Sequence, residues 1–129
     1  MKIGIAGIGL IGGSLAIQLR KTIKDVIIYG YDSSDINLNK GIDLELIDAV
    51  ILKKDFAELD VIFLTFPVKE ITNQLSSILD LVSKKTLVVD FGSTKSKICE
   101  SISSHPKRSQ FLATHPIAGT EFSGPTAAK

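Results

Sequence analysis

The chain has 129 residues, 44% of them hydrophobic and 22% charged, which is typical of one globular domain. A net charge of +1 gives no reason to expect nucleic acid or an acidic membrane surface as a partner. We expect no membrane-spanning run and no signal peptide, because Lys2 is followed by a short strand and a glycine turn. A single cysteine indicates a reducing cytoplasm, and two histidines without ligand spacing predict no metal site.

Short apolar runs alternate with helical patterns along the chain. The expected strands are residues 1–6, 26–31, 49–52, 61–65, 86–90 and 110–114. We expect four helices. The first begins near residue 15, and the second covers residues 36–46 with an interruption at Gly41. The third begins at residue 68, and the fourth runs from a cap at Ser93 or Thr94 to about residue 104. This alternation predicts a doubly wound α/β fold of the Rossmann type, with six parallel strands in the order 3-2-1-4-5-6.

A glycine-rich turn joins the first expected strand to the first expected helix. Residues 7–14 read Gly-Ile-Gly-Leu-Ile-Gly-Gly-Ser, and we call residues 7–12 the glycine elbow. Gly7 permits the tight turn, Gly9 lets a pyrophosphate approach the backbone, and Gly12 lets helix and strand pack closely. Leu10 and Ile11 belong to the candidate cofactor-binding set, because the following helix offers free N–H groups and a dipole that attract phosphate. The elbow therefore predicts a dinucleotide site.

Asp32 ends the second expected strand, about 20 residues beyond the last motif glycine, where such folds carry a ribose-binding acid. A carboxylate there accepts both ribose hydroxyls and repels a 2′-phosphate, which favours NAD over NADP. The alternative is a helix cap, because residues 32–35 are rich in capping residues. Three residues at the end of the fourth expected strand complete the candidate cofactor-binding set: Thr65, Phe66 and Pro67.

Three segments at expected strand ends carry a family resemblance. They are the glycine elbow with the following Gly-Ser, residues 90–95 (Asp-Phe-Gly-Ser-Thr-Lys), and residues 115–125 (His-Pro-Ile-Ala-Gly-Thr-Glu-Phe-Ser-Gly-Pro). In these segments the chain resembles the prephenate dehydrogenases and the related arogenate dehydrogenases of tyrosine biosynthesis. The third segment is the most specific, because it is long and rich in uncommon residues.

The resemblance implies an NAD-dependent oxidative decarboxylation of prephenate to 4-hydroxyphenylpyruvate. It implies that His115 hydrogen-bonds the substrate hydroxyl, that Ser93 contacts the histidine and the substrate, and that Thr120 and Glu121 line the substrate pocket. A neutral imidazole suits proton transfer near neutral pH. Taken alone, Ser93 would be a helix cap and His115 an exposed loop residue, and we expect Lys95 to be solvated.

The resemblance also implies a helical second domain that supplies dimer contacts and cations for the substrate carboxylates. We therefore expect residues 1–117 to form the dinucleotide-binding domain and 118–129 a loop leading toward that absent domain. This fragment alone should bind NAD with little or no dehydrogenase activity. The alternatives are an arogenate dehydrogenase domain, and a stand-alone NAD-binding or redox-sensing module acting through a partner protein. Another two-domain dehydrogenase, such as a β-hydroxyacid dehydrogenase or a pyrroline carboxylate reductase, does not account for residues 115–125.

Overall fold

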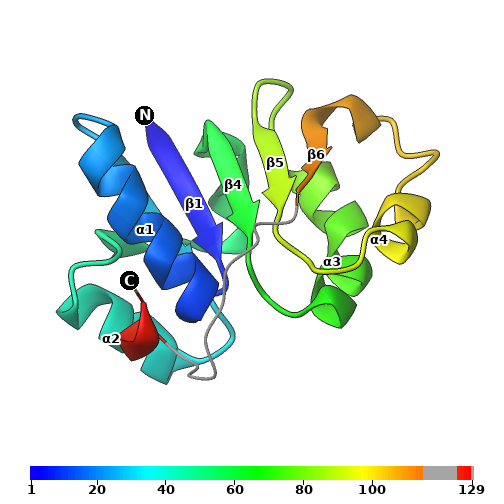
Figure 1. Cartoon of the computed structure of the whole chain (residues 1–129). Helices are drawn as coiled ribbons and strands as arrows, with labels where there is room; N and C mark the ends of the chain where they lie inside the picture. Colours follow the sequence, from blue (N-terminus) through cyan, green and yellow to red (C-terminus); the bar gives the residue numbers. More distant parts are fainter. Residues whose placement is uncertain (115–124, 129) are drawn as a thin grey trace.

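The computed structural model describes residues 1–114 and 125–128, and it contains a six-stranded parallel sheet with helices on both faces (Figure 1). The strands are β1 (Lys2–Ala6), β2 (Ile27–Tyr31), β3 (Ala49–Val50), β4 (Val61–Leu64), β5 (Leu87–Asp90) and β6 (Phe111–Ala113). The helices are α1 (Leu10–Thr22), α2 (Asp35–Asp43), α3 (Val68–Leu81) and α4 (Ser96–Ser101), with 3₁₀ turns η1 (Lys53–Glu58), η2 (Arg108–Gln110) and η3 (Pro125–Ala127). No helix within these ranges is long and apolar enough to cross a bilayer.

The strand order is β3-β2-β1-β4-β5-β6, and every neighbouring pair is parallel. This confirms the predicted doubly wound topology. The order reverses between β1 and β4, so the carboxyl ends of these two strands flank the place where such sheets bind ligands. Both outer strands are short, with two residues in β3 and three in β6.

Two apolar clusters hold the layers together. One joins β1 and β2 to α1 and α2 through buried side chains that include Ile5, Ala16 and Ile28. The other joins β4 and β5 to η1, α3 and α4 (Figure 1). The α3 side chains Ile71, Leu75, Ile78 and Leu79 are all fully buried in it, as their helical spacing predicts.

Three helices differ from the prediction at their ends. Helix α1 begins at Leu10 and not near residue 15. Helix α2 ends at Asp43, and Gly41 lies inside it, where a Cβ would approach Ile8 and Ile47 to within 3.1–3.3 Å. Gly41 therefore allows close packing and does not interrupt the helix. Helix α4 begins only at Ser96 and has no side-chain cap, so the predicted cap at Ser93 or Thr94 is wrong. The preceding loop is held by Asp90, as described below.

Candidate functional site

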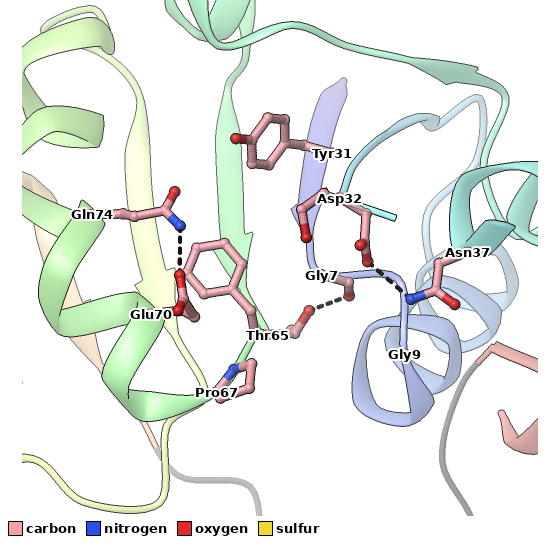
Figure 2. A pocket seen from close by; sticks show the side chains of 11 residues that line it. Gly7, Gly9, Tyr31, Asp32, Asn37, Thr65, Pro67, Glu70 and Gln74 are labelled. Atoms are coloured by element: carbon pink, nitrogen blue, oxygen red, sulfur yellow. Dashed lines mark hydrogen bonds between the residues drawn. The ribbon is translucent and has the colours of Figure 1, made fainter. Parts of the chain in front are cut away.

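A cleft opens at the carboxyl ends of β1, β2 and β4, between the first turns of α1 and α3 (Figure 2). We call it the elbow cleft. Its volume is about 270 Å³, close to the lower limit of about 300 Å³ for small-molecule pockets. The described residues that line it are Gly7, Gly9, Tyr31, Asp32, Ser33, Asn37, Thr65, Phe66, Pro67, Glu70 and Gln74.

The three motif glycines of the elbow serve different purposes. Gly7 has φ of +108°, and a Cβ on it would lie 2.7 Å from the Phe66 nitrogen. A Cβ on Gly12 would lie 2.1 Å from the Gly7 carbonyl oxygen. Both residues are therefore required by the packing of the chain on itself. A Cβ on Gly9 would meet nothing within 4 Å, so the free space of the elbow lies at Gly9.

The start of α1 presents backbone donors beside this free space. Gly9 occupies the N-cap position of α1 without a side-chain cap. The Gly13 N–H donates to the Gly9 carbonyl oxygen at 2.9 Å, so the amides of Leu10, Ile11 and Gly12 precede the helical hydrogen-bond ladder. Such amides, together with the positive end of the helix dipole, make a site suited to phosphate.

Asp32 extends its carboxylate toward the elbow from the end of β2. Its Oδ2 accepts a hydrogen bond from the Ile8 N–H at 2.7 Å, and its Oδ1 accepts one from the Ser34 N–H at 2.8 Å. The Asn37 Nδ2 also donates to Oδ2, at 3.5 Å, so Oδ1 is the oxygen that keeps a free acceptor position. The residue is only partly buried. The cap of α2 is Ser34, whose hydroxyl accepts from the Asn37 N–H at 3.3 Å, so the alternative of Asp32 as the cap is wrong.

The residues after β4 form the opposite wall of the cleft. The Thr65 hydroxyl lies 2.6 Å from the Gly7 carbonyl oxygen and 3.1 Å from that of Ala6. Thr65 therefore fastens the end of β4 to the elbow. Phe66 follows it, and Pro67 occupies the N-cap position of α3.

A second carboxylate, Asp90, ends β5 and is fully buried. Its Oδ2 accepts from the Lys95 ammonium at 2.5 Å and from the Gly92 N–H at 3.0 Å. Its Oδ1 accepts from the Thr114 N–H at 3.2 Å, and its backbone carbonyl oxygen accepts from the Thr114 hydroxyl at 2.5 Å. We call this group the Asp90 junction. The expectation that Lys95 is solvated is wrong, because Asp90 holds it.

The candidate catalytic residues stand apart from the elbow cleft or outside the described residues. Ser93 is exposed in the loop between β5 and α4, within the segment that the Asp90 junction holds. His115, Thr120 and Glu121 lie outside the described residues. Thr114, the last residue described before His115, is fixed to the end of β5 by the junction.

Five residues that line the cleft were missed by the sequence analysis: Tyr31, Ser33, Asn37, Glu70 and Gln74. Tyr31, Ser33 and Asn37 lie near Asp32 in the sequence, so proximity could have indicated them. The signal for Glu70 and Gln74 is their spacing of four residues on the helix after β4, which places them on one face.

A parallel sheet that reverses its order at a glycine elbow, with an acid at the end of the neighbouring strand, defines a nucleotide-binding domain of the doubly wound α/β class. Residues 15–129 match the family model described as "Prephenate dehydrogenase, nucleotide-binding domain". The chain belongs to this family.

The relatives agree with this assignment. The prephenate dehydrogenase of Bacillus subtilis is 33% identical over 97% of this chain and 35% of its own length. A crystal structure of the Aquifex aeolicus prephenate dehydrogenase with hydroxyphenyl propionate and NAD+ matches with a TM-score of 0.82 at 31% identity, over 100% of this chain and 46% of that one. Synechocystis arogenate dehydrogenase matches with a TM-score of 0.82 at 29% identity, over 100% and 45%. The chain thus spans less than half the length of these proteins.

Proposed function

We propose that this chain is the NAD-binding domain of an enzyme that oxidatively decarboxylates prephenate or arogenate. The observation that carries the proposal is Asp32, which the Ile8 and Ser34 amides hold at the elbow while its Oδ1 keeps a free acceptor position. Its Oδ2 has only a long further contact, with Asn37 at 3.5 Å, which a ligand hydroxyl can replace. Two ribose hydroxyls are the donors that such a carboxylate takes in this fold. A matching family model and a relative solved with NAD+ support the same cofactor.

The described residues suit the pyrophosphate and the adenosine ribose of the cofactor. The open space at Gly9 and the first amides of α1 suit the pyrophosphate. Asp32 suits the ribose, and its negative charge disfavours the 2′-phosphate of NADP. When bound, NAD supplies the acceptor for the substrate hydride. The chain's own part in that step is to hold and orient the cofactor.

For the whole enzyme, we propose that His115 takes the proton of the substrate hydroxyl and that Ser93 orients the histidine and the substrate. Thr120 and Glu121 are proposed to line the substrate pocket. The family resemblance supports these assignments, and it also implies a helical domain that forms a homodimer. The single cysteine supports a cytoplasmic enzyme. The choice between prephenate and arogenate depends on how the whole protein recognises the side chain that differs between them.

The cofactor assignment is tested on this chain by calorimetric titration with NAD and NADP. We expect NAD to bind more tightly than NADP, and Asp32→Ala to lower NAD affinity about tenfold because it loses two ribose hydrogen bonds. Gly9→Ala should also weaken NAD while leaving the unfolding transition unchanged, because its methyl group occupies open space. Equal affinity for NAD and NADP in the unmodified chain would contradict the role of Asp32.

The reaction is tested with a longer protein, extended by whatever coding sequence follows residue 129. We expect it to oxidise prephenate or arogenate with NAD, and His115→Asn to lose turnover while keeping NAD affinity. Turnover that survives the substitution removes His115 from the reaction. If the longer protein binds NAD and acts on neither substrate, the dehydrogenase proposal fails and the stand-alone module is favoured.

A further inference from the structure

We propose that Glu70 and Gln74 select the base of the bound dinucleotide by accepting hydrogen bonds from the exocyclic amino group of adenine. The inference rests on the proposed function, because it requires the adenosine half of NAD to occupy the elbow cleft. Its basis is the unpaired, buried Gln74 Oε1 and the Glu70 carboxylate, on the wall of the cleft opposite Asp32.

The two side chains form a pair on one face of α3. The Gln74 Nε2 donates to the Glu70 Oε2 at 3.1 Å, across one helical turn. Figure 2 shows both side chains extending from α3 across the cleft from Asp32 and Asn37. A ribose held by Asp32 carries its base on one side and its phosphates, at the elbow, on the other. The α3 wall is the part of the cleft left for the base.

One atom of this pair lacks a partner. Gln74 Oε1 is buried and accepts no hydrogen bond within the part of the chain that the structure describes. Turning the amide over would not satisfy it, because an oxygen would then face the Glu70 carboxylate. A buried acceptor without a donor costs free energy, so a rotation of the Gln74 amide that brings Oε1 to a donor in the cleft is favoured.

The free groups of the pair are chiefly acceptors. Glu70 is exposed. Its carboxylate uses one acceptor position for the Gln74 amide and has further positions for other donors. Only the second N–H of Gln74 remains as a donor. Adenine presents an amino group at C6, whereas hypoxanthine presents an oxygen there. The pair therefore favours adenine and opposes a 6-oxo base.

A purely structural role for the pair makes a different prediction. Glu70 lies in the first turn of α3, where a negative charge is stabilised by the helix dipole, and the contact with Gln74 adds modest helix stability. If that were its whole purpose, the identity of the base would not matter to binding. The two roles are separated by measuring affinity for two cofactors that differ only in the base.

The probes are NAD and nicotinamide hypoxanthine dinucleotide, titrated into this chain by calorimetry. We expect NAD to bind about tenfold more tightly, the effect of one well-placed hydrogen bond replaced by a repulsive contact. Glu70→Gln should lower this ratio severalfold, because its amide can donate to the 6-oxo group. Gln74→Leu should lower it as well. Glu100→Gln, an exposed substitution on α4, is the matched control and should leave the ratio unchanged.

Each outcome decides between the two roles. A ratio that falls in Glu70→Gln but not in Glu100→Gln supports the inference. Equal binding of both dinucleotides by the unmodified chain overturns the inference and leaves the NAD proposal intact. A tenfold ratio that neither Glu70→Gln nor Gln74→Leu changes has the same meaning. A chain that binds neither dinucleotide overturns the proposed function and this inference together.

Discussion

Asp32 and Asp90 occupy the same kind of position and are used in opposite ways. Each ends or follows a parallel strand, and each accepts hydrogen bonds from two backbone amides of neighbouring segments. Asp32 is partly exposed and lines a cleft, and no cation within the described residues pairs with it. Asp90 is fully buried, and Lys95 neutralises it at 2.5 Å.

The difference shows what leaves a carboxylate at a strand end available to a ligand. Backbone amides anchor both side chains, so this anchoring does not distinguish them. The counter-charge does, since a carboxylate paired with an ammonium has little remaining attraction for the hydroxyl groups of a ligand. Three substitutions test this contrast by a common measurement, the free energy of unfolding in urea.

The largest effect is expected for Asp90→Asn. This substitution removes the negative charge that pairs with Lys95 and one acceptor of the Asp90 junction. The free energy of unfolding should fall by about 3 kcal/mol. Equilibrium urea unfolding measures it. The control is Asp90→Asn combined with Lys95→Met, which should recover part of the loss because no uncompensated ammonium remains. An Asp90→Asn variant as stable as the unmodified chain would show that the ion pair contributes nothing.

A smaller effect is expected for Asp32→Asn. The amide oxygen can still accept from one of the Ile8 and Ser34 amides, and no buried cation is left unpaired, so the loss should be about 1 kcal/mol. The same variant should lose NAD affinity. If Asp32→Asn destabilises the domain as much as Asp90→Asn, the contrast between the two carboxylates is wrong.

The smallest effect is expected for Ser93→Ala. Ser93 lies in the loop that the Asp90 junction holds, but its own side chain is exposed, so the change should stay within about 0.5 kcal/mol. In a longer protein with dehydrogenase activity, the proposed role predicts a loss of turnover at unchanged stability. A marked loss of stability would identify Ser93 as a structural residue.

The position of the first carboxylate was predictable from sequence, and the setting of the second was not. Asp32 was expected beside the elbow because strand, turn, helix and strand have nearly fixed lengths in this fold, and the structure places it there. Its role in binding ribose stays a prediction. Lys95 lies only five residues beyond Asp90, but the intervening loop has no regular geometry that would predict the ammonium folding back. The late start of α4 escaped prediction for the same reason.

Helix positions in the site were predictable only in part. The spacing of Glu70 and Gln74 shows that they share a face of α3, and the buried residues Ile71 and Leu75 show which face packs on the sheet. Whether the polar face overlooks the cleft depends on the angle at which α3 leaves Pro67, which spacing does not give. Ser93 and His115 were named through the resemblance, and their roles stay predictions.

The two shortest strands of the sheet, β3 and β6, are also its two borders. A border strand exposes unpaired N–H and C=O groups along its length, and another chain can add a strand there. With two and three residues, these borders offer too few such groups for stable pairing between molecules. The architecture that concentrates ligand-binding groups at the centre of the sheet thus also protects the domain from edge-to-edge aggregation.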